Sequence, residues 1–106
     1  MGYATKDEVK AQLRLTGAAN DTEVEAAIAD FDTRIDSKLQ IYEKTLPLTS
    51  PPNIIKKVSK FGACSVWLVL NPTAEVQKDL AATYERLALE WLDEYIQEKY
   101  HAPAIK

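Results

Sequence analysis

The stretch IDSKLQIYEKTLPLTSPPNI, residues 35–54, decides the fold of this chain. Its first part has the apolar spacing of a helix end, and its second part contains Pro47, Pro51 and Pro52. Proline lacks a backbone N–H and pushes the residue before it toward extended geometry. The stretch therefore predicts one helix that ends, a short proline-punctuated crossover, and a second helix that begins.

The helix before the crossover is predicted at about residues 21–43, with Asn20 or Asp21 as its N-cap. Its apolar residues recur at steps of three and four positions, which places them on one face. Acidic residues dominate its first two turns, where they suit the helix dipole. The residues of the apolar face are Val24, Ile28, Phe31, Ile35, Leu39 and Tyr42.

The helix after the crossover is predicted at about residues 51–70, with Ser50 as its N-cap and Pro51 at its first position. Its second half is apolar nearly all round, which is typical of a central helix with neighbours on several sides. Its first half carries three lysines, Lys56, Lys57 and Lys60. We interpret these lysines as a solvated edge, and a phosphate contact is the alternative.

Two more helices are predicted at the ends of the chain. Thr5 and Glu8 have the spacing of a capping box, which predicts a short helix at about residues 5–15. A long last helix is predicted at about residues 73–99, with alanines that permit close approach of a neighbour. Its expected inward residues are Val76, Leu80, Tyr84, Leu87, Trp91 and Tyr95.

The expected fold class is therefore all-α, with four helices. The crossover lies between the second and third helices, and the last helix is long. Residues 1–100 are expected to form a single helical domain, since 106 residues suit one core. Residues 101–106 are expected to be a flexible tail, because they lack periodicity and Pro103 opposes helical continuation.

Composition and charge exclude several functional classes. The net charge is −3, since residues 1–53 carry nine acids and six bases and residues 54–106 carry seven of each. A nucleic-acid binder needs a concentrated basic face, which this pattern does not predict. An acidic half could still line a surface past which DNA slides. The longest apolar run, 61–70, is far shorter than the ~20 residues of a membrane span, and no secretory signal is evident.

No set of residues predicts catalysis, a cofactor or a metal site. Cys64 is the single cysteine and is expected to be buried. His101 is the single histidine and lies in the tail, and one histidine alone does not make a metal site. No serine has the partners that would activate it. The expectation is a protein that is not an enzyme.

The order of motifs is similar to that of a known family. A helix end Ile35-Asp36-Ser37-Lys38-Leu39 is followed by Leu46-Pro47-Leu48 and then by Pro51-Pro52-Asn53-Ile54. With Tyr3-Ala4-Thr5 before the first helix, this order resembles the small head–tail connector (head-completion or adaptor) proteins of tailed bacteriophages, particularly Mu-like phages. The resemblance covers roughly residues 3–97. The chain departs from that pattern at Gln40-Ile41 and in the apolar ending of the third helix.

The resemblance implies a non-enzymatic structural virion protein of the head–tail junction, present in the host cytoplasm before assembly. Such proteins form a ring, commonly of about twelve subunits, that docks below the portal protein and extends the DNA channel. Tail-completion proteins dock on that ring. Genomic DNA passes through the lumen without sequence-specific binding, and no cofactor, metal or membrane is involved.

A ring of identical subunits uses a heterologous contact, in which one patch meets a different patch of the neighbour. We predict one patch in the crossover, at Leu46, Pro47 and Leu48, and the other on the last helix, at Tyr95 and Tyr100. For the two leucines there is an alternative. They could fold back under the crossover as a small apolar cluster.

Two other functional classes stay open at this point. A small cytoplasmic helical regulatory module would bind a partner helix, and it predicts a stable monomer or dimer with an apolar groove. An enzyme acting through Arg14, Arg34 and Arg86 predicts a closed polar pocket that contains all three. Surface ion pairs are the simpler interpretation of these arginines.

Overall fold

The computed structural model describes residues 2–71 and 75–100, and this part of the chain is all-α, as predicted. The helices are α1 (Lys6–Leu13), α2 (Asp21–Leu39), α3 (Asn53–Leu70) and α4 (Glu75–Tyr100). Their order, and the crossover between α2 and α3, agree with the sequence pattern. None of these helices combines the length and the apolar character needed to cross a lipid bilayer.

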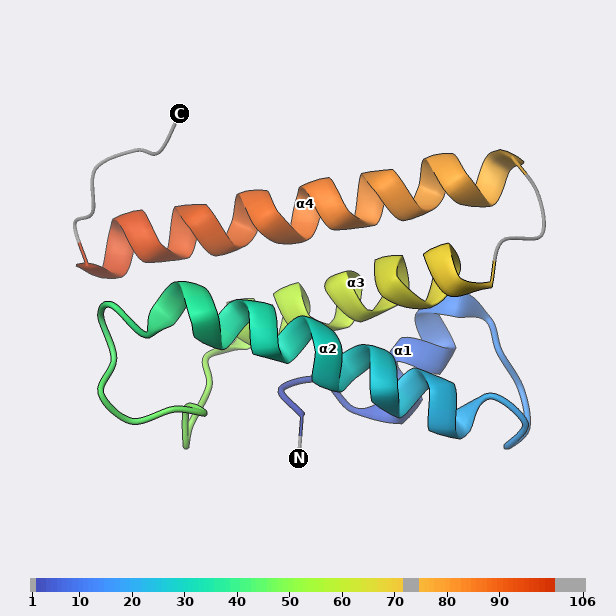
Figure 1. Ribbon diagram of the computed structural model, residues 1–106, viewed down its shortest axis with the longest axis horizontal. Helices are drawn as coiled ribbons and strands as arrows, with labels where there is room; N and C mark the ends of the chain where they lie inside the picture. The colour runs from blue at the N-terminus through green and yellow to red at the C-terminus, as the bar shows by residue number, and fades with distance from the viewer. Residues whose placement is uncertain (1, 72–74, 101–106) are drawn as a thin grey trace.

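The helix α3 is central, because it packs against each of the other three helices. Figure 1 shows α4 along one side of α3, with α2 and α1 on the other. α2 and α4 run in the same direction and α3 runs opposite to both. Consequently α2 and α4 end at the same end of a molecule that measures 40 × 29 × 18 Å.

The core consists of two clusters of buried side chains that both draw on α2 and α3. The cluster that includes α4 contains Tyr3, Phe31, Ile35, Leu39, Ile55, Val58, Ala88, Leu92 and Ile96. The cluster that includes α1 contains Ala4, Val9, Val24, Ala27, Ile28, Ala63 and Cys64. The five predicted inward residues of α2 up to Leu39 are therefore buried, as their spacing indicates.

The predicted capping box at the start of α1 is confirmed. The Glu8 backbone N–H donates to the Thr5 hydroxyl at 3.2 Å, and the Thr5 N–H donates to Glu8 Oε1 at 2.9 Å. This second bond holds the pKa of the Glu8 carboxyl below its usual value. The helix ends slightly earlier than predicted, because Arg14 adopts the left-handed conformation with φ of 59°.

The second helix starts where predicted but ends at Leu39, four residues before the predicted end. The backbone N–H groups of Tyr42 and Glu43 both donate to the Leu39 carbonyl, so the chain turns there. Tyr42 does not join the buried face of α2. Its ring stacks instead on the ring of Tyr100. This contact holds Tyr42 outside the helix.

The prediction that Ser50 caps α3 and Pro51 is its first residue is wrong. Pro52 occupies the N-cap position in extended geometry, and its carbonyl accepts from the N–H groups of Ile55 and Lys56. The reason is the second proline. Because Pro51 precedes another proline, it is itself pushed out of helical geometry, and the helix can begin only after Pro52.

The predicted inward face of α4 is rotated from the observed one. The buried residues are Ala81, Ala88, Leu92 and Ile96, while Leu80 is 38% exposed. The other predicted residues from Tyr84 to Tyr95 are half-buried and flank this line. The buried line therefore combines two small residues, Ala81 and Ala88, which allow close approach to α3, with the large residues Leu92 and Ile96. The predicted start at residue 73 and the side chain of Val76 lie outside the described part.

Candidate functional site

The crossover leucines, which form the first predicted interface patch, are half-buried. Leu46 and Leu48 both pack against the core cluster that includes α4, while Pro47 is exposed. The fold-back alternative therefore describes how they lie within one chain. Their role in a contact between subunits remains a prediction, for which Pro47 and the exposed parts of the leucines are available.

The crossover is tied to the body of the molecule by Tyr3. The Tyr3 hydroxyl donates to Asp36 Oδ1 at 2.5 Å and accepts from the Leu48 backbone N–H at 2.9 Å. Burial, reinforced by the hydrogen bond to Asp36, raises the pKa of Tyr3 above its ordinary value. One side chain from the N-terminal segment thus sets the position of the crossover against α2.

The second predicted patch lies beside the first one. Tyr95 and Tyr100 are half-buried against the same core cluster. The Tyr100 ring stacks on the Tyr42 ring with centroids 4.6 Å apart, and its hydroxyl donates to the Glu43 carboxylate. Burial is the first cause that raises the pKa of Tyr100, and the Glu43 hydrogen bond is the second. Both predicted patches therefore share the end of the molecule where α2 and α4 finish (Figure 1).

The structure exposes apolar side chains that the sequence patterns did not predict to be exposed, including Tyr42 of the predicted apolar face. Beyond the end of α2, Ile41 is 80% exposed and Tyr42 is 37% exposed. At the opposite end of the molecule, Val69 is 67% exposed and Leu70 is 71% exposed. Both residues belong to the half of α3 predicted to have neighbours on several sides. No signal in the sequence indicates this exposure, because apolar spacing does not say which helix lies over the last turn of α3.

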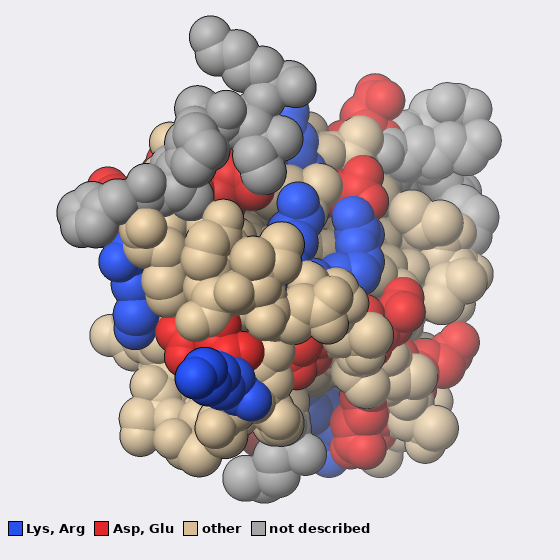
Figure 2. Space-filling model, turned by 60° about the vertical axis from the view of Figure 1, so that its left-hand side comes forward, with Lys and Arg blue, Asp and Glu red and all other residues tan. Residues whose placement is uncertain are grey.

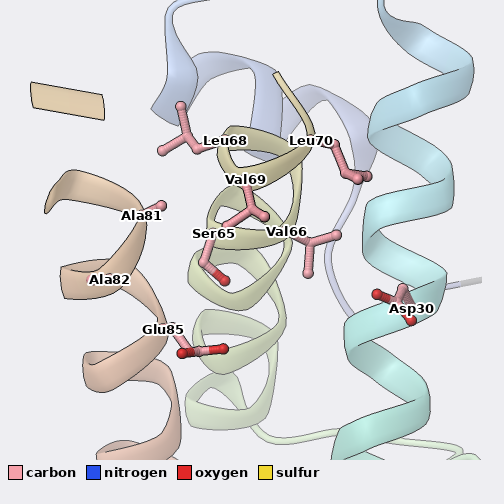
Figure 3. A pocket seen from close by; sticks show the side chains of 9 residues that line it. All are labelled: Asp30, Ser65, Val66, Leu68, Val69, Leu70, Ala81, Ala82 and Glu85. Atoms are coloured by element: carbon pink, nitrogen blue, oxygen red, sulfur yellow. The ribbon is translucent and has the colours of Figure 1, made fainter. Parts of the chain in front are cut away.

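An open groove of about 580 Å³ lies over the end of α3, between α2 and α4 (Figure 3). Its floor comes from the last turns of α3, where the Val66 and Leu70 side chains lie toward α2. Asp30 stands on the α2 side and Glu85 on the α4 side. The full lining is Asp30, Ser65, Val66, Leu68, Val69, Leu70, Ala81, Ala82 and Glu85. We call this the α2–α4 groove.

A small polar network lies on the other side of α2. Asp32 accepts from the Tyr3 backbone N–H at 2.8 Å and from the Ser59 hydroxyl at 2.5 Å, and that hydroxyl accepts from the Ala4 N–H at 3.1 Å. Burial raises the pKa of Asp32 above its ordinary value, against these hydrogen bonds. The network joins the N-terminal segment to both α2 and α3, which is a structural role.

The three arginines do not converge on one pocket. Arg34 pairs with Glu85 of α4 at 3.2 Å, and Arg86 pairs with Glu90 on its own helix at 3.3 Å. Arg14 is an exposed residue at the end of α1. Surface ion pairs account for the first two, as the simpler interpretation expected.

Groups that could carry chemistry are held away from solvent or far from partners. Cys64 is buried as predicted, and burial raises the pKa of its thiol to about 12. Among the described residues, no three His, Cys, Asp or Glu side chains lie close enough to hold a metal ion. His101 lies outside the described part of the chain.

The lysines of α3 contact aromatic rings. The Lys57 ammonium lies 4.2 Å from the centroid of the Trp91 ring, and that of Lys60 lies 5.3 Å from the Phe61 centroid. On the face seen in Figure 2, acidic and basic side chains are interspersed between uncharged ones and do not gather into one basic area. This arrangement agrees with a solvated edge.

The comparisons with known proteins do not place the chain in a family. Neither a protein-family model, nor a curated protein, nor a solved structure matches it.

Proposed function

We propose that this protein is a structural subunit of a bacteriophage head–tail connector ring, which docks below the portal protein and extends the DNA channel. The observation that carries the proposal is the distribution of exposed apolar side chains. They lie at both ends of the long axis, around Ile41 at one end and around Val69 and Leu70 at the other. A subunit that contacts two neighbours through two different patches needs surfaces of this kind. The resemblance in the motifs supports the same function.

The anchored crossover gives this proposal a defined docking surface. Tyr3 holds Leu48 at one point, and Tyr100 holds the chain beside Tyr42 at another. A loop fixed in this way loses little entropy when it meets a partner. In the proposed ring, the crossover end with Pro47 and Tyr95 contacts a neighbouring subunit or the portal. Tail-completion proteins would bind elsewhere on the same ring, and DNA would pass through its lumen.

Concentrated purified protein, with and without the portal protein, tests this function. Native mass spectrometry and electron microscopy are expected to show monomers at low concentration and closed rings at high concentration or on the portal. Added to heads that lack it, the protein is expected to restore joining to tails. A protein that neither self-associates nor joins heads to tails would contradict the proposal.

A second candidate function is a helical module that binds a partner helix. The α2–α4 groove favours it, because an apolar floor between two helices suits an amphipathic helix. This candidate expects a stable monomer or dimer that forms no rings at any concentration, and saturable binding of a helix with basic flanks. The sizing experiment distinguishes the two functions directly.

A further inference from the structure

The large apolar side chains that are most exposed, within residues 2–71 and 79–100, form two groups at opposite ends of the molecule. One group is Ile41 and Tyr42, which with Lys44 we call the α2 knob. The other group is Val69 and Leu70, which line the α2–α4 groove, and Leu80, which precedes the lining residue Ala81 in α4. Because the helices alternate in direction, the knob and the groove cannot meet within one chain, whose long axis measures 40 Å.

The knob projects from a fixed base. The backbone N–H of Tyr42 donates to the Leu39 carbonyl, and the Tyr42 ring stacks on Tyr100. Glu43, the next residue, accepts from the Tyr100 hydroxyl. Ile41 is therefore presented to solvent by a turn that is held on both sides. Such preorganisation reduces the entropy cost of seating it in a partner.

The groove has the shape to receive a branched aliphatic side chain. Ala81 and Ala82 are the α4 wall, and their small side chains leave the floor at Val69 accessible (Figure 3). The Arg34–Glu85 ion pair joins α2 to α4 beside it. An apolar floor with carboxylates at its rim favours an apolar insert with a polar flank.

The charges of the two surfaces are complementary. The groove carries the exposed carboxylate of Asp30 on its α2 side, while Glu85 on its α4 side is paired with Arg34. The knob carries the exposed ammonium of Lys44 three residues after Ile41. A basic flank on the insert and the acidic residue Asp30 on the receptor also steer the encounter of the two surfaces.

We propose that Ile41 of one copy of this chain inserts into the α2–α4 groove of the next copy, with Lys44 beside Asp30. The contact is heterologous, because a different surface is used on each partner, so it extends into a ring or an open helix. This inference rests on the proposed function, since it names the contact between neighbouring subunits of the ring. Few residues take part, far fewer than the about 20–30 per side of a standard interface, so the contact alone is weak.

Cysteine cross-linking tests the contact. The double variant Ile41→Cys/Val69→Cys places thiols in the knob and on the groove floor. A disulfide needs Cα atoms about 4–7 Å apart, so these two can join only between copies. Buried Cys64 does not compete. We expect a ladder of oligomers under mild oxidation at millimolar protein concentration. The matched control, Ile41→Cys/Thr22→Cys, has its second thiol at an exposed residue outside the groove and is expected to give no ladder.

Mixing two blocked variants tests the direction of the contact. Ile41→Asp blocks the knob and leaves the groove intact. Val69→Glu blocks the groove and leaves the knob intact. Both substitutions are at exposed positions, so the monomers are expected to stay folded. Each variant alone is expected to associate at least about tenfold more weakly than the parent chain. Their mixture is expected to form a dimer and nothing larger. Gln40→Asp, which adds the same charge beside an intact knob, is the control.

Several outcomes would overturn the inference. A cross-link between residue 41 of two copies would show an isologous contact. If deleting residues 101–106 abolished association while Ile41→Asp did not change it, the tail and not Ile41 would occupy the groove. Rings that form without the 41–69 cross-link would overturn this contact and leave the proposed function intact. If residues 41 and 69 cross-link but heads join to tails without this protein, the proposed function is overturned and the contact stands.

Discussion

At the scale of single residues, Gly62 shows how closely α2 and α3 pack. A Cβ atom built on Gly62 would lie 2.1 Å from Cδ2 of the Phe31 ring, which is fully buried. Glycine in the middle of a helix normally costs stability relative to alanine, by about 1 kcal/mol. Here the Phe31 ring leaves no room for a Cβ atom, and this steric requirement for glycine outweighs that cost.

We predict that Gly62→Ala lowers the free energy of unfolding by about 1–3 kcal/mol, because the ring of Phe31 must move in a packed core. Urea denaturation measures the change. In Gly62→Ala/Phe31→Leu, the smaller side chain makes room, and the two effects are expected to be less than additive. A stabilised Gly62→Ala protein would show that the two helices are further apart than described.

The Tyr3 hydroxyl is a second example at the scale of single residues, because it donates one hydrogen bond and accepts another. We predict that Tyr3→Phe costs about 1–3 kcal/mol, since the Leu48 N–H loses its acceptor and Asp36 loses its donor. Amide hydrogen exchange at Leu48 is expected to accelerate.

A matched control for this prediction is Tyr84→Phe. It removes a hydroxyl that accepts from Gln12 at 3.1 Å, between α1 and α4. Exchange at Leu48 is expected to stay unchanged in this variant. If Tyr84→Phe accelerated it equally, the effect would be general destabilisation and not release of the crossover.

At the scale of elements, α1 is held to the start of α2 by charge. Asp21 accepts from Lys10 at 2.6 Å and pairs with Lys6 at 3.2 Å. These contacts, the Lys10 hydrogen bond first, hold the pKa of the Asp21 carboxyl below its ordinary value. A lowered pKa in the folded state means that the unfolded state binds protons more readily, so acid weakens the link.

We therefore predict that α1 is the first helix to lose amide protection on acidification. The stabilisation from Asp21 is present above its unfolded pKa of about 3.9 and is lost as the pH falls through the lower folded value. Hydrogen exchange followed by NMR measures it helix by helix. In Asp21→Asn, the acid dependence of α1 is expected to shrink. Loss of protection in α4 before α1 would contradict the prediction.

The pKa of Asp32 is shifted in the opposite direction to that of Asp21. Its folded pKa is raised by burial, so its contribution is present below the unfolded pKa and is lost as the pH rises through the folded one. Asp32 thus offsets part of the stability that is lost through Asp21 as the pH falls. We expect Asp32→Asn to lose stability more steeply with acid than the parent chain, measured by urea denaturation across the same pH series.

At the scale of the whole molecule, the distribution of charge sets the behaviour toward DNA. The chain carries 13 basic and 16 acidic residues, and Lys57 and Lys60 lie over aromatic rings at the edge of α3. Affinity for duplex DNA depends on how many phosphates are neutralised together. Dispersed cations neutralise few of them at once.

We predict no nanomolar binding of duplex DNA at physiological salt, because the cations are dispersed. Fluorescence anisotropy with a labelled duplex, repeated at several salt concentrations, measures it. Weak binding with a shallow salt slope would agree with the prediction. Tight binding that Lys56→Glu/Lys60→Glu abolishes would instead support the phosphate-contact alternative.

The sequence by itself determined the local features of this protein. The capping box acts over three residues, prolines act on their immediate neighbours, and the apolar face of α2 follows from a repeat of three and four. For that reason the fold class, the order of the helices and the crossover could all be predicted.

Only the tertiary structure decided which apolar residues meet a neighbour. The rotation of α4 depends on how closely α3 approaches its alanines, and the early end of α2 depends on Tyr100, far away in the sequence. The exposure of Ile41 and Val69 depends on where neighbouring helices stop. Periodicity reports that a residue is apolar and on which face it lies, but burial is a property of two surfaces together. The two apolar ends, which carry the proposed function, therefore became visible only in the folded chain.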